Sequence, residues 1–320
     1  MKATREILQA IKKHRRFLIS THVSPDPDGL SSELAMAMFL RKMGKQVVIV
    51  NEETVPVRYG FLPGAKMIRS CRAARIADYD AAIIVDCGDL GRIGPVGKLL
   101  RPDRLLINID HHITNDLFGD LNLNDPSASS TAEVIYELFR EGGASLTKDM
   151  AVLLYLGIMT DTGCFRYENT TSRTHEVAGH LLKFSFSISE LYRRLYETVP
   201  LRDLQNFSRL LNHFEVFEKG RIVCLEVSKQ MLRQFSDAID LRDCVFKYLR
   251  TIAGVEVLVV LTEHRKNETR VNLRSQGGVD VARIASGFQG GGHPRASGCK
   301  IAGDLKAAKR KIISRIKQSL

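Results

Sequence analysis

The stretch Phe17-Leu18-Ile19-Ser20-Thr21-His22-Val23-Ser24-Pro25-Asp26-Pro27-Asp28-Gly29 decides the fold, because an apolar run ends directly in one imidazole and two carboxylates. The run Phe17–Thr21 predicts a buried strand. Ser31-Ser32-Glu33 then predicts the start of a helix that continues to Met43. A strand, a turn rich in potential ligands and a helix N-terminus together favour a divalent cation facing an anion.

The same arrangement recurs at two further points of the chain. Ala81–Val85 leads into Asp86, and Leu105–Ile109 leads into Asp110-His111-His112. Fully apolar runs of this length are typical of strands in a parallel sheet that is covered on both faces. Ligands of such sheets gather outside the carboxyl ends of the strands. We therefore expect these Asp and His side chains to converge at one edge of a sheet.

The order of elements predicts an α/β fold. Val47–Asn51 has the pattern of a strand, and a helical stretch is expected shortly before Ala81. Ser130-Thr131-Ala132-Glu133 matches a capping box that opens a helix to about Arg140. Asp149–Thr160 is apolar at helical spacing and ends at Asp161. This alternation indicates a mainly parallel sheet flanked by helices.

A change of pattern after this region predicts a second, smaller lobe. Residues 187–214 are helical in pattern and rich in Arg, without the preceding alternation. From about Glu215 strand-like runs return, and a glycine-rich segment begins at Gly290. We predict a metal-binding catalytic domain over 1–186, a helical connector over 187–214, and a smaller α/β substrate-binding domain over 215–320, facing the first across a cleft.

Length and composition bound the class of protein. At 320 residues two domains are expected, since about 100–200 residues per domain is usual. The net charge of +11 is compatible with a polyanionic substrate or with solubility alone. No apolar run approaches the roughly 20 residues of a membrane span, and the N-terminus lacks a signal-peptide core, so we expect a cytoplasmic protein without membrane contact. The six cysteines form no CxxC pair, which disfavours a cysteine zinc site. Nothing indicates an obligate protein partner, and a homodimer is compatible with the sequence.

The candidate metal ligands combine carboxylates with imidazoles. They are His22, Asp26, Asp28, Asp86, His111 and Asp161. Such donors suit Mn²⁺, Zn²⁺, Fe²⁺ or Mg²⁺ better than Ca²⁺ or copper. Four carboxylates on one ion would be unusually anionic, whereas two cations that share a bridging carboxylate resolve this. Each residue alone has an ordinary explanation as a turn or capping residue. Their joint occurrence at successive strand ends is what indicates a metal site.

At these residues the chain resembles a known family. The His-x-x-x-Asp-x-Asp motif from His22, followed by Asp86, Asp110-His111-His112 and Asp161, resembles the motifs of the DHH phosphoesterases. Gly290-Gly291-Gly292-His293 is similar to the signature of the associated DHHA1 domain. The segment from Asp161 to Thr171 and the chain length resemble the compact bacterial enzymes that act on short oligoribonucleotides and on 3′-phosphoadenosine 5′-phosphate.

The resemblance implies a role for each motif residue. One cation would be held by His22, Asp26 and Asp86, and another by Asp28, Asp86, His111 and Asp161, with Asp86 bridging. The family typically uses Mn²⁺. The residues implied in catalysis are Asp86, Asp110 and His112: His112 would face the scissile phosphate, and Asp110 would orient His111.

The second lobe has the features of a phosphate-binding site. A run of three glycines lets backbone N–H groups form an anion-binding nest. His293 and Arg295 would add charge-assisted hydrogen bonds, and Arg274 and Ser275 are a second plausible contact. The candidate substrate-binding residues are Arg274, Ser275, Gly290, Gly291, Gly292, His293 and Arg295.

The function implied by the resemblance is hydrolysis of very short RNA to mononucleotides, together with conversion of 3′-phosphoadenosine 5′-phosphate to AMP. A phosphodiesterase for cyclic dinucleotides, or for their linear products pApA and pGpG, remains an alternative. A nucleotide-binding sensor without catalysis is a more remote one. Aromatic residues make up only 7% of the chain and Trp is absent, so an extended stacking platform for long single strands is not evident.

Overall fold

The computed structural model describes residues 2–73, 78–265 and 267–320. The chain divides into two compact units, residues 1–195 and 196–320, and each unit has its own sheet and core. The segment expected as a connector, 187–214, is shared between the two units. Within the described parts of the chain, no helix has both the length and the apolar character that a bilayer crossing requires.

The first unit is built on a parallel sheet with the strand order β3-β2-β1-β4-β5-β6. Its strands are β1 (Arg16–Ser20), β2 (Gln46–Asn51), β3 (Ile68–Ser70), β4 (Ala81–Val85), β5 (Leu105–Asp110) and β6 (Leu121–Asn124). The apolar runs predicted as strands are β1, β2, β4 and β5, so the expectation of a parallel α/β sheet is confirmed. The strand order reverses between β1 and β4, and ligands of such sheets bind outside the strand ends at this point.

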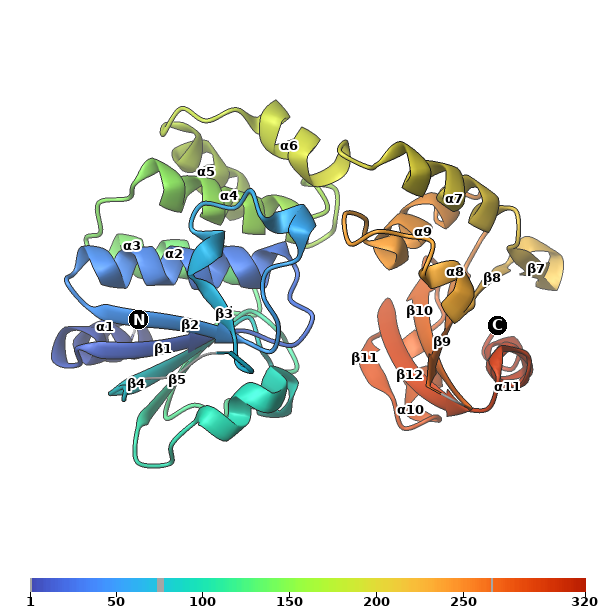
Figure 1. The fold of residues 1–320 in the computed structure, drawn as a ribbon, viewed down its shortest axis with the longest axis horizontal. Coiled ribbons are helices and arrows are strands. Elements are labelled where there is room, and N and C mark those ends of the chain that lie inside the picture. The colour runs from blue at the N-terminus through green and yellow to red at the C-terminus, as the bar shows by residue number, and fades with distance from the viewer. Residues whose placement is uncertain (1, 74–77, 266) are drawn as a thin grey trace. The chain divides into compact units, whose positions relative to one another are not determined.

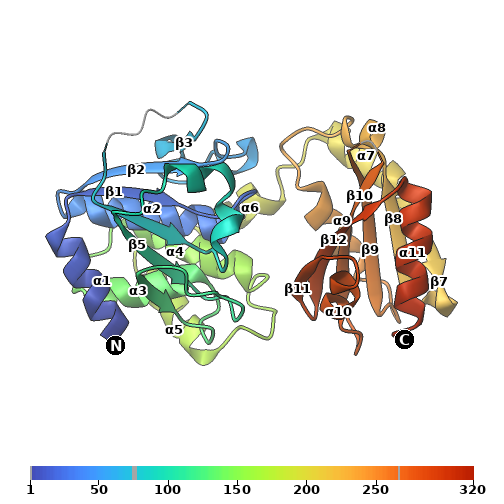
Figure 2. The same cartoon turned by 90° about the horizontal axis from the view of Figure 1, so that it is seen from below.

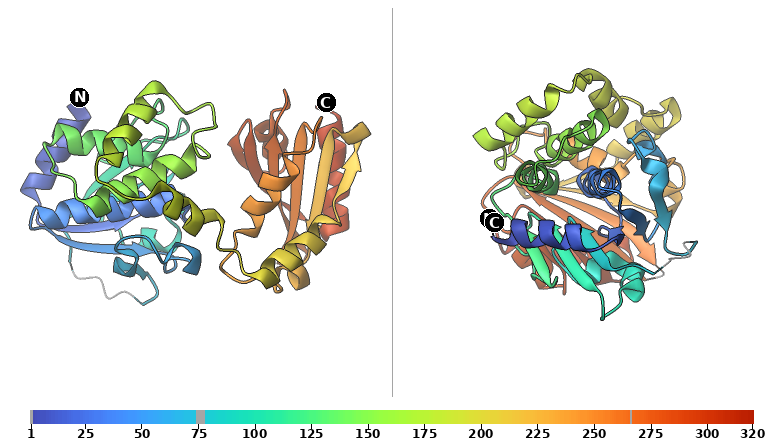
Figure 3. Two further views of the ribbon diagram at one scale, coloured as in Figure 1. Left: turned by 90° about the horizontal axis from the view of Figure 1, so that it is seen from above. Right: turned by 90° about the vertical axis from the view of Figure 1, so that its left-hand side faces the viewer.

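Helices cover this sheet in layers. Those of the first unit are α1 (Lys2–Lys13), α2 (Pro27–Lys42), α3 (Thr131–Glu141), α4 (Lys148–Asp161), α5 (Ser172–Leu182) and α6 (Ile188–Tyr196). Helices α2 and α3 lie on one face of the sheet, α4 packs across both, and α5 packs on α4 (Figure 1). Figure 3 shows the same layers from two further sides. An apolar cluster under the 3₁₀ segment η3 (Leu90–Leu99) lies against β2 and β4.

Two elements differ from the sequence-based expectation. Helix α2 begins at Pro27 rather than Ser31, because the Asp26 carboxylate caps it by accepting the N–H groups of Asp28 and Gly29 (3.0 and 3.1 Å). The prediction of a helix before Ala81 is wrong for the described residues up to 73. That region forms a short 3₁₀ turn and then β3, which pairs with the outer edge of β2. Tertiary pairing outweighs local helix propensity here. Residues 74–77 lie outside the described part of the chain.

The second unit has a mixed sheet with the order β11-β12-β10-β9-β8-β7, in which only the β8–β9 pair is parallel. Its strands are β7 (Glu215–Phe217), β8 (Ile222–Val227), β9 (Val257–Arg265), β10 (Glu268–Ser275), β11 (Gly291–His293) and β12 (Ala296–Ala302). The α-helices are α7 (Leu201–Leu211), α8 (Lys229–Leu232), α9 (Leu241–Leu249), α10 (Val281–Ser286) and α11 (Leu305–Lys317).

The second sheet has a different set of helices on each face. Helices α10 and α11 share one apolar core with the sheet, and α7 and α9 share another with β8 and β9. Figure 2 shows α11 running along the sheet. Helix α11 buries Ile312, Ile313 and Ile316 and exposes most of its basic residues. The basic C-terminal segment is therefore a docked helix with a solvated face.

Candidate metal centre

Asp86 lies at the centre of the candidate site, directly after the carboxyl end of β4. Its side chain is only 2% exposed, and its φ of 53° is in the left-handed region, which Asp tolerates better than most residues. His22 Nε2, from the loop after β1, lies 3.5 Å from Asp86 Oδ2. His111 Nε2, from the loop after β5, lies 3.9 Å from Asp86 Oδ1. Three strand ends therefore deliver side chains to this point.

All six predicted ligands belong to groups whose donor atoms lie within 4.8 Å of one another. The groups are His22–Asp26–Asp86, Asp86–His111–His112 and Asp28–His111–Asp161. Two of them share Asp86 and two share His111, so the groups form one continuous cluster. Carboxylate oxygens and imidazole nitrogens fit a hard or borderline divalent cation. The donor set of the cluster therefore fits the metal dependence that the motifs imply.

The N-terminus of α3 holds two of the predicted ligands. The Asp28 carboxylate accepts hydrogen bonds from the N–H groups of Thr131 (2.8 Å) and Ala132 (3.0 Å). The Thr131 hydroxyl donates to Asp86 Oδ1 at 2.9 Å. A helix N-terminus stabilises nearby negative charge, so α3 both orients and stabilises these carboxylates. Sequence reasoning found the helix start but missed Thr131, because its contacts reach more than 40 residues back along the chain.

The start of α3 is itself anchored by a buried carboxylate. Ser130 Oγ accepts the Glu133 N–H at 3.1 Å, which confirms Ser130 as the N-cap, but the predicted capping box differs because the Glu133 carboxylate accepts the Ser129 N–H instead of the Ser130 N–H. The Glu133 side chain accepts hydrogen bonds from Ser129 and Thr174, and it forms an ion pair with Arg173 at 2.9 Å. This network fixes the loop between β6 and α3 against helix α5.

Asp161 reaches the cluster from the C-terminal end of α4. Its Oδ2 lies 3.3 Å from His111 Nε2. The Asn169 side chain donates to the carbonyl groups of Asp161 (3.2 Å) and Ser129 (2.8 Å), which joins this end of α4 to the loop before α3. Gly157, one turn earlier in α4, is needed because a Cβ there would collide with Asp28 and Ala132. The close approach of α4 to α2 and α3 therefore depends on Gly157.

Asp110 orients His112 and not His111, so the expectation about its partner is wrong. Asp110 Oδ1 lies 2.7 Å from His112 Nδ1, whereas His111 Nδ1 faces the Ala128 carbonyl at 3.4 Å. In an extended chain, residues i and i+2 lie on the same side, which places Asp110 and His112 together. Asn115 holds the other Asp110 oxygen through a hydrogen bond of 2.6 Å.

The carboxylates of the cluster perturb one another. Burial, followed by the charges of Asp86 and Asp161, raises the pKa of Asp28 well above its ordinary value. Burial also raises the pKa of Asp161, to about 7. Although burial opposes it, the interactions of Asp86 with His22, His111 and His112 lower the pKa of Asp86. Crowded, buried acids of this kind are the arrangement that a bound cation relieves.

In the second unit, Arg274 and His293 share one face of the sheet. Both are in register with Ala296 of β12, Arg274 from β10 and His293 from β11. Ser275 faces the other way, and its hydroxyl donates to the Gly277 carbonyl at 3.3 Å. The Arg295 guanidinium also donates to the Gly277 carbonyl, at 3.0 Å. Of these four predicted contacts, the structure brings two together on one face.

The three glycines do not form the expected nest of N–H groups. The Gly290 N–H donates to the Ala285 carbonyl at 2.9 Å, which terminates α10, and Gly291 and Gly292 belong to strand β11. A Cβ at Gly290 would collide with Gly298 and Cys299, and one at Gly292, where φ is +135°, would meet Ala296 O at 2.6 Å. A Cβ at Gly291 would meet nothing within 4 Å. Gly290 and Gly292 are therefore needed for packing, and Gly291 is the one open to a ligand.

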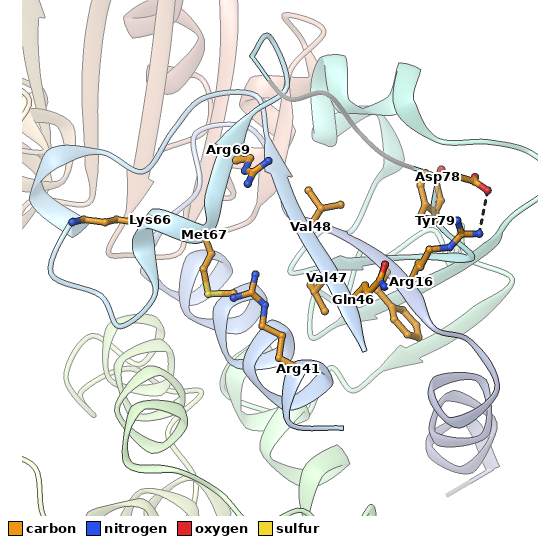
Figure 4. Close-up of a pocket in the computed structure, with 11 residues that line it drawn as sticks. Arg16, Arg41, Gln46, Val47, Val48, Lys66, Met67, Arg69, Asp78 and Tyr79 are labelled. Atoms are coloured by element: carbon orange, nitrogen blue, oxygen red, sulfur yellow. Dashed lines mark hydrogen bonds and ion pairs between the residues drawn. The ribbon is translucent and has the colours of Figure 1, made fainter. Parts of the chain in front are cut away.

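A pocket of about 410 Å³ in the first unit is separate from the metal centre (Figure 4). Arg16 and Gln46, the first residues of β1 and β2, line it together with Met67, Arg69 and Tyr79. Arg16 forms an ion pair with Asp78 at 3.1 Å there. The pocket lies at the amino end of β1, whose carboxyl end leads to His22, so it is not part of that site.

Comparison with known proteins agrees with these motifs. Residues 16–158 match the DHH family, N-terminal domain, and residues 225–320 match the DHHA1 domain. The bifunctional oligoribonuclease and PAP phosphatase NrnA of Bacillus subtilis is 32% identical over 92% of each chain. The protein of the same name from Thermus thermophilus is 31% identical over 100% of this chain and 94% of its own. An exopolyphosphatase-related protein from Bacteroides fragilis shares the fold, with a TM-score of 0.90 and 24% identity over 99% of this chain and 96% of its own. The chain therefore belongs to the DHH family of metal-dependent phosphoesterases and carries a DHHA1 domain after its catalytic domain.

Proposed function

We propose that this chain hydrolyses phosphoester bonds in very short oligoribonucleotides, releasing mononucleotides, and converts 3′-phosphoadenosine 5′-phosphate to AMP. The observation that carries the proposal is the continuous cluster of donor groups joined through Asp86 and His111. The relatives that match nearly the whole chain are named for these two activities. Such substrates arise in the cytoplasm, where we expect the protein to act.

Two divalent cations, with Mn²⁺ the expected species, would share the cluster. His22, Asp26 and Asp86 would hold one, and Asp28, Asp86, His111 and Asp161 would hold the other. When bound, such a pair polarises phosphate oxygens and lowers the pKa of a water molecule to near neutrality. The protein's own part is to fix the donor atoms, which the N-terminus of α3 does for Asp28 and Asp86.

His112 is proposed to contact the substrate. Asp110 engages its Nδ1, and Asn115 in turn holds Asp110. His112 Nε2 is proposed as the atom that contacts an oxygen of the scissile phosphate. Asp110 is then a positioning residue for His112, and Asp86 is a residue that would hold both cations.

The proposal assigns catalysis to the first lobe and substrate binding to the second. Residues 1–186 form the catalytic domain, 187–214 the connector and 215–320 the substrate-binding domain. Arg274 and His293 are proposed as phosphate contacts, since they share one face of the second sheet. Gly291 would allow close approach of the ligand to the backbone beside them, because a side chain is absent there.

A substrate panel tests the proposal. It comprises RNA dimers to pentamers, 3′-phosphoadenosine 5′-phosphate, pyrophosphate, and cyclic and linear dinucleotides, each with Mn²⁺ or Mg²⁺. Mononucleotide release from RNA dimers and AMP formation are expected, and Asp86→Ala should abolish both. Faster turnover of cyclic dinucleotides would favour a cyclic-dinucleotide phosphodiesterase. Binding of nucleotides without any turnover would identify a sensor.

A further inference from the structure

On the face of the second sheet that α7 and α9 cover, strand β10 presents a set of polar and charged side chains, of which Arg274 packs on Phe246 of α9. Strand β10 alternates strictly: Thr269, Val271 and Leu273 are buried, whereas Arg270 is exposed and Asn272 and Arg274 are half-buried. The apolar cluster that α7 and α9 form on this second face involves β8 and β9. The side chains of Arg270, Asn272 and Arg274 continue that face onto β10.

The strand register arranges this face into three rows. Arg270 lies opposite Lys300 of β12, Asn272 opposite Gly298, and Arg274 opposite Ala296. On β11, Gly291 continues the middle row and His293 the last one. Paired residues of an antiparallel sheet point to the same side. The middle row therefore carries a single side chain, that of Asn272, between one row with Arg270 and Lys300 and another with Arg274 and His293.

The row of Arg270 and Lys300 is unfavourable for the sheet by itself. Like charges directly opposite each other destabilise an antiparallel pair. Partial desolvation, and after it the positive charge of Arg242 on α9, lower the pKa of Arg270. Among the described residues, no ion pair or hydrogen bond to an acidic group is found for the side chains of Arg270 and Lys300. An anionic group bound between them would remove the repulsion.

We propose that Arg270 and Lys300 form a second phosphate-binding subsite, for an internal phosphate of the oligonucleotide chain. Arg270 and Arg274 are four residues apart on β10, about 14 Å at the rise of an antiparallel strand. This exceeds the separation of the two phosphates of a single nucleotide. A substrate anchored at Arg274 and His293 reaches the second subsite only when it is longer than one nucleotide. This inference rests on the proposed function. It adds a physical reason why the enzyme would bind substrates longer than one nucleotide through an additional contact.

The test compares Arg270→Gln and Lys300→Gln with the control Lys306→Gln. Lys306 is exposed on α11, which packs on the opposite face, so the control removes the same charge elsewhere. For RNA tetramers and pentamers, kcat/KM should fall roughly tenfold in the two subsite variants, as expected for loss of a charge-assisted hydrogen bond. Turnover of 3′-phosphoadenosine 5′-phosphate should stay at the wild-type value. Arg270→Lys, which keeps the charge, should recover most of the loss.

The salt dependence of binding gives a second readout. Affinity of a fluorescent pentanucleotide is measured in EDTA, where turnover stops, at several salt concentrations. Each lost phosphate contact should lower the slope of log K against log salt by about 0.7. Thermal unfolding should show no destabilisation in Arg270→Gln, since one of two repelling charges is removed.

The possible results distinguish failure of the proposed function from failure of the second subsite. Absence of RNA cleavage by the wild-type protein would contradict the proposed function. Normal cleavage by wild type, together with unchanged pentamer cleavage in both subsite variants, would overturn the second subsite alone. An equal loss on pentamers and on 3′-phosphoadenosine 5′-phosphate would also overturn it, because that result places Arg270 in the anchor for single nucleotides.

Discussion

Replacing Thr131 by Val tests whether the N-terminus of α3 controls metal binding. The substitution keeps the shape of the side chain and removes the hydroxyl that donates to Asp86 Oδ1 at 2.9 Å. The main-chain N–H that Asp28 accepts is kept, and both residues are almost fully buried. The variant therefore removes one hydrogen bond to a carboxylate that the proposed function assigns to both cations.

The expected magnitude follows from that single contact. A hydrogen bond to a charged group contributes about 1.5–3 kcal/mol. Loss of a residue that orients a metal ligand typically lowers metal affinity by about 10- to 100-fold. We therefore expect Thr131→Val to bind Mn²⁺ roughly 10- to 100-fold more weakly, while kcat at saturating Mn²⁺ stays near the wild-type value.

The assay is calorimetric titration of metal-free protein with Mn²⁺, followed by activity against Mn²⁺ concentration. Thr131→Ser should restore affinity, because it restores the hydroxyl. Thr174→Val is the matched control: it also loses a buried hydroxyl that donates to a carboxylate, at 3.0 Å from Glu133, but it contacts no predicted ligand. Wild-type Mn²⁺ affinity in Thr131→Val would refute the reasoning, and so would an equal loss in both Thr→Val variants.

Three further predictions concern folding and catalysis. Burial raises the pKa of Glu33 well above 4.5, so the folded protein loses stability as the pH rises above 4.5 and the unfolded chain ionises this carboxyl. Glu33→Gln should therefore be more stable than wild type in alkaline buffer. Chemical denaturation should show this difference in the free energy of unfolding closing toward pH 4. Gly290→Ala should lower the free energy of unfolding by about 1–3 kcal/mol or more through overpacking, and Tm with it, while Gly291→Ala should keep Tm and raise KM for RNA; the reverse order would contradict the packing argument. Asp110→Asn presents an N–H to His112 Nδ1 and favours the other tautomer, so kcat should fall by about 100-fold or more with Mn²⁺ affinity retained; unchanged kcat would exclude the positioning role.

Much of the candidate site could be predicted from the sequence because its residues follow strands directly. The runs before His22, Asp86 and Asp110 are the strands β1, β4 and β5, and a parallel sheet brings their carboxyl ends to one edge. Asp161 was the least constrained of these predictions, since it ends a helix and not a strand. Its position depends on the close packing at Gly157, which local sequence does not reveal.

Long-range contacts explain what could not be predicted. The partners of Thr131 lie 45 and 103 residues away in the chain, and nothing in the capping pattern around Ser130 identifies them. The partner of Asp110 was predicted wrongly, because a metal-bound His usually has a carboxylate behind it, and local chain geometry instead selected His112. The pairing of Arg270 with Lys300 depends on the register of β10 and β12, which residue patterns within each strand leave open.

The chemistry of the two units separates metal binding from phosphate binding. The predicted metal ligands, from His22 to Asp161, all belong to the first unit, whereas the proposed phosphate contacts other than His112, from Arg270 to Lys300, belong to the second. A cluster of carboxylates repels a phosphate until cations are bound, but a row of cations attracts one without any metal. Metal-free protein should therefore still bind a pentanucleotide, with an affinity that falls steeply with salt, and Arg270→Gln should bind Mn²⁺ as wild type does. If removing the metal abolished pentanucleotide binding at low salt, phosphate recognition would depend on the cations of the first unit, and this separation would be wrong.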